Sequence, residues 1–232
     1  MKYFEHGYET PSLLARRATQ PVIKPPKAWN SFKRGGKSST QLVDDLLPRQ
    51  YHLCSYCENR LSDSPGSLGF HIEHILSKSL NPSLTFEYTN LMLSCFKDGS
   101  EASPSEEDPE PVSCGHARLK ASNAFDEAFF IKPTEAGCER YFFYELEGEI
   151  VPHPDLNDQD IERAQHTIDV LNLNCLRLKR LRSDVIDQLS RSSAELVNHP
   201  SQLEFFIQQE LSVREDELAL FWTTRKQLLS PG

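Results

Sequence analysis

Cysteine spacing limits what this chain can fold into more than any other feature of its sequence. Cys54 and Cys57 form a C-x2-C pair, and Cys95 and Cys114 follow later in the chain. A two-residue gap lets two thiolates converge on one metal ion, and structural zinc takes four ligands arranged as a tetrahedron. We therefore predict a structural Zn²⁺ bound by all four cysteines. A module of this size has a small core, so such an ion would contribute strongly to its folding.

The cysteines also permit a second interpretation. Cys54 and Cys57 could form a redox pair, with the two later cysteines as separate buried thiols. A redox C-x-x-C pair usually lies at the start of a helix in a βαβ pattern, which this sequence lacks, so the zinc site is favoured. Cys138 and Cys175 fall outside the spacing, and both are expected to be ordinary buried cysteines.

An acidic segment, residues 100–112, separates Cys95 from Cys114. Its sequence, SEASPSEEDPEPV, contains five acids and three prolines. Such a composition has little apolar surface to bury, which predicts a mobile loop. The entropic cost of closing a loop rises only slowly with its length, so this insertion need not keep the two cysteines apart.

Residues suited to hydrolytic chemistry lie between the two halves of the cysteine pattern. Glu73 and His74 are adjacent within the run FHIEHI, Asn90 follows in a loop, and His116 stands two positions after Cys114. Neighbouring side chains of a strand face opposite ways, so Glu73 and His74 can serve different partners. This order is that of the HNH motif of phosphodiester-cleaving enzymes. We expect His74 to be a general base that activates water, because histidine titrates near neutral pH.

A divalent cation, Mg²⁺ or Mn²⁺, would complete this chemistry by holding the phosphate and stabilising the leaving oxygen. We expect Glu73 and His116 to bind it. Asn90 would tie the loop that orients His74 and would not touch substrate. His71 shares the face of Glu73 and is either a further metal ligand or a satisfied core histidine, the second being slightly favoured.

The rest of the pattern predicts an α+β protein with a ββα-metal core and a C-terminal helical region. Residues 1–50 form a basic N-terminal arm and a short helix from Leu42 to Leu47 that ends at Pro48. Residues 51–132 form the nuclease core. Residues 133–232 begin with two short strands around Gly148, within 139–151. Helical spacing then extends from 161 to 189, and a last helix is expected over 201–229.

Charge is spread unevenly. The whole chain has a net charge of −9, although residues 1–40 hold eight basic and two acidic side chains. A basic arm could steer a phosphate backbone or bind a partner, or could simply be a solvated arm. The sequence has no apolar run of membrane-spanning length and no apolar stretch at residues 1–10, so a cytoplasmic protein without membrane contact is expected.

These motifs together resemble the HNH nuclease subunit PtuB of Septu-type anti-phage systems, which is also found beside some retrons. The central motif is specific for HNH nucleases with a zinc knot, and the downstream motifs narrow the resemblance to this family. The resemblance covers nearly the whole chain and rests on the segments 54–58 (CSYCE), 71–75 (HIEHI), 88–91 (YTNL), 93–95 (LSC), 131–133 (IKP), 138–142 (CERYF), 148–150 (GEI) and 168–174 (IDVLNLN).

The resemblance implies a nuclease effector that cleaves DNA, works beside an ABC-type ATPase subunit and is held in check until infection. The metal and base roles of the family carry over to Glu73, His74 and His116. The sequence departs from HNH enzymes at large in having Glu73 where Asp is more common, and in placing one glycine between Cys114 and His116.

Three other functions remain compatible with the sequence. The chain could be a non-catalytic zinc-ribbon binding module, or an RNase effector that cuts tRNA or other structured RNA by the same chemistry. It could also be an interaction protein whose C-terminal helices present a basic cluster to nucleic acid or to a partner, although a solvated helix face is favoured there. That cluster consists of Arg177, Lys179, Arg180 and Arg182.

Overall fold

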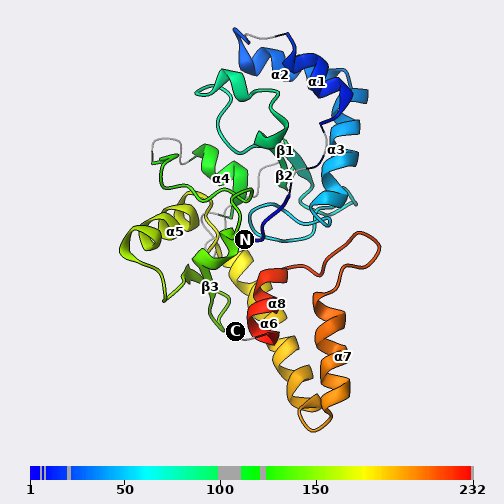
Figure 1. The fold of residues 1–232 in the computed structure, drawn as a ribbon, viewed down its shortest axis with the longest axis vertical. Helices are drawn as coiled ribbons and strands as arrows, with labels where there is room; N and C mark the ends of the chain where they lie inside the picture. Colours follow the sequence, from blue (N-terminus) through cyan, green and yellow to red (C-terminus); the bar gives the residue numbers. More distant parts are fainter. Residues whose placement is uncertain (6, 8, 20–21, 99–110, 121–123, 231–232) are drawn as a thin grey trace.

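The computed structural model describes residues 1–5, 7, 9–19, 22–98, 111–120 and 124–230 (Figure 1). The predicted acidic loop therefore lies outside the described residues, except for positions 111 and 112. Among the described helices, none is both long and apolar enough to span a bilayer.

In chain order the elements are α1 (Pro11–Arg17), α2 (Pro25–Arg34), α3 (Lys37–Arg49), β1 (Phe70–His74), η1 (Pro82–Leu84), η2 (Tyr88–Asn90), β2 (Leu91–Cys95), α4 (Cys114–Lys120), η3 (Cys138–Tyr141), β3 (Phe142–Tyr144), β4 (Ile150–Pro152), α5 (Asp158–Val170), α6 (Leu176–Leu196), α7 (Pro200–Leu211) and α8 (Trp222–Leu229).

The centre of the molecule is the ββα arrangement that the sequence predicts. Strands β1 and β2 pair antiparallel, with Phe70 opposite Cys95 and His74 opposite Leu91. Helix α4 packs against β2, every residue of which is buried. A second two-stranded sheet, β3–β4, and the remaining helices surround this core (Figure 1). The fold is thus of the mixed α+β class, with small antiparallel sheets.

The basic N-terminal segment is folded onto the core. Helix α2 begins at two prolines, which suit a first helical turn because its N–H groups have no partner there. Trp29 and Phe32 of α2 are buried and contact Phe86, in the segment between the two central strands. Helix α3 starts earlier than predicted and runs through Pro48, which lies in its last turn, where a missing N–H costs only one helical hydrogen bond.

The hairpin predicted around Gly148 is confirmed as β3–β4. Glu145 and Glu149 close its turn with backbone hydrogen bonds. Gly148 has a positive φ of 80° and packs against α6 so closely that an added Cβ would lie 2.1 Å from the carbonyl oxygen of Lys179. Both features require glycine at this position.

The single helix expected over 201–229 is wrong: α7 ends at Leu211 and α8 begins only at Trp222. Between them the chain returns to the segment that holds the first cysteine pair. Phe221, with a positive φ, donates its N–H to the Glu58 carbonyl, and the Glu58 carboxylate accepts the N–H of Thr223 in the first turn of α8. An anion there stabilises a helix start. Tertiary contacts therefore override a helical pattern that contains no proline or glycine.

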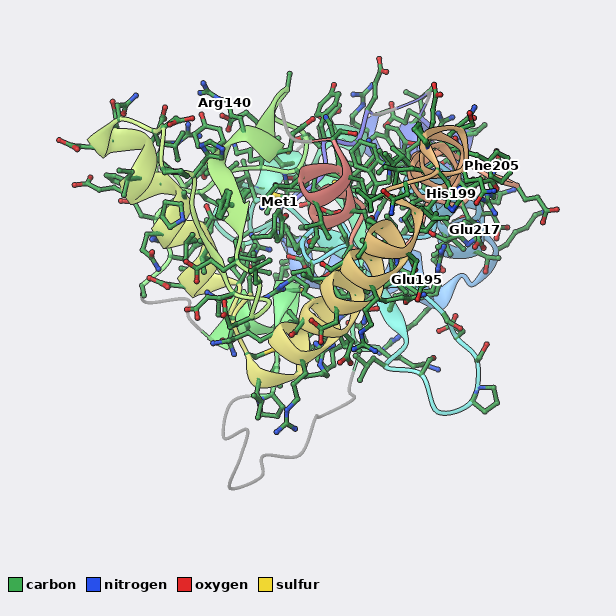
Figure 2. All side chains as sticks on the ribbon, turned by 90° about the horizontal axis from the view of Figure 1, so that it is seen from below. Met1, Arg140, Glu195, His199, Phe205 and Glu217 are labelled. Atoms are coloured by element: carbon green, nitrogen blue, oxygen red, sulfur yellow. The ribbon has the colours of Figure 1, made fainter. Side chains whose placement is uncertain are left out.

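The second helix of the C-terminal helical hairpin is largely exposed. Helix α7 has no buried residue, and the side chain of Phe205 is 62% exposed. Figure 2 shows Glu195 and His199 where α6 passes into α7, and Phe205 on α7.

The basic cluster predicted on α6 is not a uniform solvated face. Arg182 is fully buried and donates to the carbonyls of Gly148 and Leu173, which ties the β3–β4 turn to the helix. Lys179 forms an ion pair with Glu149 at 2.9 Å. These basic side chains are used within the fold, which weakens the interpretation that they form a nucleic-acid surface.

Candidate metal centres and the cleft between them

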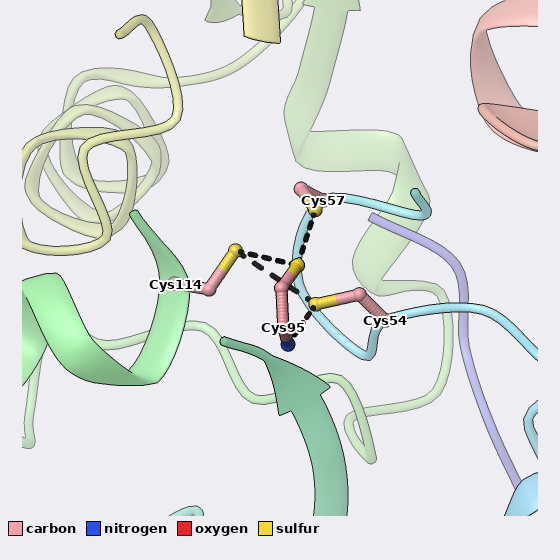
Figure 3. Close-up of side chains that lie close together, drawn as sticks. All are labelled: Cys54, Cys57, Cys95 and Cys114. Atoms are coloured by element: carbon pink, nitrogen blue, oxygen red, sulfur yellow. Dashed lines mark hydrogen bonds between the residues drawn. The ribbon is translucent and has the colours of Figure 1, made fainter. Parts of the chain in front are cut away.

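Four buried cysteines converge at the end of β2 (Figure 3). The Sγ–Sγ distances are 3.7 Å for Cys54 and Cys114, 3.2 Å for Cys57 and Cys95, and 3.7 Å for Cys95 and Cys114. Four thiolates bound to one zinc ion at about 2.3 Å each would stand about 3.8 Å apart. The thiols form no disulfide, and their spacing fits a structural zinc site.

Each cysteine is positioned by a local feature of the chain. The first pair lies in a tight turn closed by hydrogen bonds from the Cys54 N–H to the Asn59 carbonyl and from the Glu58 N–H to the Cys54 carbonyl. Cys95 ends β2, and its N–H points at the Cys54 sulfur at 3.3 Å. Cys114 begins α4 with a positive φ of 62°, and its N–H donates to the Leu171 carbonyl at 2.7 Å. The second pair thus closes on the first although the acidic segment lies between its members.

Arg177 of α6 supplies positive charge beside this cysteine cluster. Its guanidinium lies 5.4 Å from the ring centre of Phe96 and donates to the Ser113 hydroxyl at 2.9 Å. Burial lowers the pKa of Arg177, but the neighbouring Cys57 and Cys95 raise it by more, so the pKa lies above its ordinary value. A zinc ion with four thiolates carries a net negative charge, so a half-buried cation at this position would balance it.

A cleft of about 350 Å³ opens on the other side of β1, between α2, the loop after β1, and α4. His71, Glu73 and His74 of β1 line it together with Asp98, which follows β2. Three of the histidine and acidic residues in and beside this cleft form a group that could hold a metal ion. His71, Asp98 and His116 each offer one ligand atom, and these three atoms lie within 4.8 Å of one another.

His74 ends β1 and is almost completely buried. Its Nε2 lies 3.1 Å from the Thr85 carbonyl, and a carbonyl can only accept, so Nε2 carries the proton and Nδ1 keeps the lone pair. The imidazole also meets the Trp29 ring edge to face, with 4.5 Å between ring centres. Burial, and next the charge of Lys78, lower the pKa of His74 to about 4. The ring is therefore neutral at pH 7 and able to accept a proton.

Glu73 faces away from His74, as strand geometry requires, and is fully engaged. One carboxylate oxygen accepts from His71 Nε2 at 2.9 Å, and the other pairs with the guanidinium of Arg118 on α4. Burial opposes ionisation, but Arg118 and then His71 hold the pKa of Glu73 at about 2. Gly115 lies so close that a Cβ there would stand 2.4 Å from a Glu73 oxygen. Glu73 is thus next to the three-residue metal group, but it does not belong to it.

His71 belongs to the metal group, whereas the sequence slightly favoured a satisfied core histidine. Its Nδ1 donates to the Phe96 carbonyl at 2.7 Å, which turns Nε2 toward Glu73 and His116. Burial lowers the pKa of His71, but the hydrogen bond with Glu73 raises it more. Since both partners are acceptors, His71 carries a proton on each nitrogen in the metal-free protein, and Nε2 would have to give up its proton and its bond to Glu73 to bind a cation. The Nδ1–H bond to a backbone carbonyl is a common second contact of metal-binding histidines.

Asp98 is the member of the group that sequence reasoning missed. It follows Cys95 by three residues and pairs with Lys33 of α2 at 2.6 Å. Burial opposes ionisation, but Lys33 lowers the pKa of Asp98 below its usual range, so the carboxylate is charged. The sequence offered one signal for Asp98, namely an acidic residue three positions after Cys95. Its place opposite the start of β1 follows only from the pairing of Cys95 with Phe70.

Asn90 makes the contacts that a loop-tying role requires. Its side-chain oxygen accepts the Leu76 N–H at 2.8 Å, and its amide nitrogen donates to the carbonyls of Leu76 and Leu84. Leu76 comes two residues after His74, so the amide fixes the chain on leaving β1. Asn90 itself is buried and does not line the cleft.

Arg118 was also missed by sequence reasoning, and its pair with Glu73 yields a stability prediction. Besides Glu73, its guanidinium donates to the backbone carbonyl of His74 at 2.5 Å and to that of Ile75.

Arg118→Met should lower the free energy of unfolding by about 3–5 kcal/mol, because it leaves the buried Glu73 carboxylate without its cationic partner. Urea unfolding of zinc-loaded protein measures this. The exposed pair of Arg191 and Asp187 provides the control, since Arg191→Met should cost about 0–1 kcal/mol. Equal losses in the two variants would contradict the role given to Arg118.

Comparison with known proteins gives a distant relative. No family model matches the chain. Over 149 residues the chain is 31% identical to a protein of Vibrio cholerae serotype O1 biovar El Tor named "Retron Vc95 putative HNH endonuclease". The aligned stretch spans 63% of this chain and 63% of the relative. The chain is therefore a distant homologue of a protein named as an HNH endonuclease.

Proposed function

We propose that this chain is a metal-dependent HNH endonuclease that hydrolyses phosphodiester bonds of DNA, with His74 as the general base. The observation that carries the proposal is one cleft lined by the neutral imidazole of His74 and by His71 and Asp98, which with His116 form a group that could hold a metal ion. The distant homology to a protein named as an HNH endonuclease supports it.

The residues of the cleft would divide the chemistry as follows. His74 Nδ1 would take a proton from the attacking water, while Thr85 and Trp29 hold the ring in place. Mg²⁺ or Mn²⁺, for which imidazole and carboxylate are suitable ligands, would hold the phosphate and stabilise the departing oxygen. In this proposal Glu73 orients His71 and joins β1 to α4 through Arg118, instead of being the main ligand expected from the sequence.

Asp98→Ala tests this ligand set directly. Loss of a carboxylate ligand should weaken Mn²⁺ binding to zinc-loaded protein by about tenfold or more, as measured by calorimetry or by the free Mn²⁺ signal in electron paramagnetic resonance. Asp63→Ala removes an exposed carboxylate from a loop outside the cleft and should leave Mn²⁺ binding unchanged. Unchanged affinity in Asp98→Ala together with a large loss in Glu73→Gln would restore Glu73 as the ligand.

The activity itself is tested with supercoiled plasmid, linear duplex DNA and structured RNA. Zinc-loaded protein should nick or cut DNA when Mg²⁺ or Mn²⁺ is added and should be inactive with a chelator that removes only the added cation. Cleavage of RNA alone would favour the RNase alternative. Cleavage of neither polymer would favour the non-catalytic zinc-ribbon module.

We further infer that the nuclease is the effector of a retron-associated anti-phage system and acts beside an ABC-type ATPase. The name of the relative includes a retron, and the motifs resemble those of PtuB-type subunits. If an ATPase gene neighbours this one, its product should copurify with the tagged nuclease when both are expressed together. Separate elution of the two proteins would contradict the partnership and leave the nuclease proposal standing.

A further inference from the structure

Lys78 is a cation in the proposed catalytic cleft for which the described residues provide no counter-ion. It is half-buried and lines the cleft together with Glu73 and His74. Among the described residues its side chain forms neither an ion pair nor a hydrogen bond. The other cations that line the cleft differ from it, because Lys33 pairs with Asp98 and Arg118 pairs with Glu73.

The position of Lys78 is fixed by the structure around it. Ser77 begins a tight turn in which its carbonyl accepts the N–H groups of Leu80 and Asn81, at 3.1 and 2.8 Å. The same loop is attached to the core by Asn90, whose amide binds both the N–H and the carbonyl of Leu76. Lys78 is therefore held at a set place relative to His74, unlike a lysine on a solvated helix face.

The surroundings of Lys78 favour the arrival of an anion. Burial lowers the pKa of Lys78, and Lys33 and Arg118 lower it too, while Glu73 and Asp98 oppose them. Since both of those carboxylates are already paired, a half-buried ammonium group keeps an unmet demand for negative charge. Lys78 and His74 line the same cleft, so an anion bound by Lys78 there would lie near the proposed base.

We propose that Lys78 binds the backbone phosphate of DNA at the cleavage position and thereby places it against His74. This inference rests on the proposed function, because it names the part of the substrate that the cleft would bind. A structural lysine would have a carboxylate or carbonyl partner in the free protein, and Lys78 has none among the described residues. A phosphate oxygen supplies that partner through a charge-assisted hydrogen bond.

Binding measurements can separate this contact from catalysis. A His74→Ala background prevents cleavage, so the dissociation constant of a duplex oligonucleotide can be measured at several salt concentrations with Mg²⁺ present. Adding Lys78→Gln should raise the dissociation constant by about tenfold. It should also reduce the slope of log K against log salt by about 0.9, the value for one lost phosphate contact with B-form DNA.

Lys27 offers a matched control. It lies on α2, is exposed, and does not line the cleft. Lys27→Gln removes the same charge and should leave both the affinity and the salt slope close to those of the His74→Ala parent. Lys78→Arg keeps the charge and should restore most of the binding. Zinc content and thermal unfolding should be unchanged in all three variants.

Two failures can be told apart. If Lys78→Gln binds DNA with the same affinity and salt slope as Lys27→Gln, the role of Lys78 is wrong, whereas metal-dependent plasmid cleavage by the wild-type protein would still support the nuclease. If the wild-type protein neither cleaves plasmid nor retains the duplex, the proposed function fails, and the inference about Lys78 fails with it.

Discussion

His74→Ala should lower the rate of DNA cleavage by about 10²–10⁴-fold, the usual contribution of a positioned general base. His74 lines the cleft but does not belong to the metal group. Its Nε2–H donates to the backbone carbonyl of Thr85, so Nδ1 is left to accept a proton from water. Initial rates of plasmid nicking at saturating Mn²⁺ measure the effect. Full cleavage by a folded, zinc-loaded His74→Ala protein would refute the assigned mechanism.

A histidine far from the cleft serves as the matched control for this experiment. His199 is exposed in the connection between α6 and α7 (Figure 2). His199→Ala should cleave at the wild-type rate. Thermal unfolding and zinc content should be the same in both variants, so that a lost rate reports chemistry and not folding.

The pH profile gives the same prediction a second readout. His74 must be neutral to act as a base, and burial holds its pKa at about 4, whereas an ordinary histidine titrates at 6.5. As the pH falls, kcat/KM should therefore persist through pH 6 and decline only near pH 4, because this ratio reports the ionisation of the free enzyme. A decline centred near pH 6.5 would mean that the base is exposed or is another residue.

Local spacing was enough to predict the centre of the fold. The run FHIEHI, the asparagine before β2 and the ordered cysteines each carry their meaning within a few residues, and the structure places them in one ββα unit. Joining Cys95 to Cys114 needed only the chemical rule that zinc takes four ligands. The β3–β4 hairpin was equally accessible, because Gly148 lies between two short aromatic and β-branched runs.

The ion pair of Glu73 with Arg118 could not be predicted, because it depends on packing between distant segments. Arg118 lies 45 residues after Glu73 on a helix that follows the acidic segment, and no local pattern indicates that its guanidinium turns back to β1. Lys33 reaches Asp98 from a helix 65 residues earlier. These contacts place Glu73 in a buried ion pair beside the group of His71, Asp98 and His116, which could hold a metal ion.

The C-terminal region shows the same limit in its secondary structure. Helical spacing over 201–229 is real, but Leu218 and Phe221 are needed in the core beside the first cysteine pair, and the chain breaks its helix to deliver them. Glu58 stabilises the restart by accepting the N–H of Thr223. Only knowledge of where the cysteine turn lies in space could have predicted that break.

Removal of zinc should unfold most of this protein. The cysteine cluster is the point where the first cysteine turn, β2 and α4 meet, and Glu58 and Leu171 connect it to α8 and to the end of α5. Structural zinc contributes on the order of 10–16 kcal/mol in finger peptides, which is as large as the roughly 5–15 kcal/mol total stability of a typical domain. We expect about one zinc per chain, and a chelator strong enough to extract it should abolish the cooperative thermal transition.

Cys54→Ser should have the same effect as zinc removal and give an unfolded or insoluble protein without bound zinc. Plasma emission spectrometry measures the zinc content, and circular dichroism measures the folded state. Cys138 is the matched control, because it is equally buried, and burial raises its pKa to about 12, so it is a neutral thiol outside the cluster. Cys138→Ala should cost about 1 kcal/mol and keep its zinc. A folded Cys54→Ser protein with unchanged zinc content would show that the ion, if present, is bound elsewhere. Strands β1 and β2 would then be held together by their backbone hydrogen bonds and side-chain packing, without help from the ion.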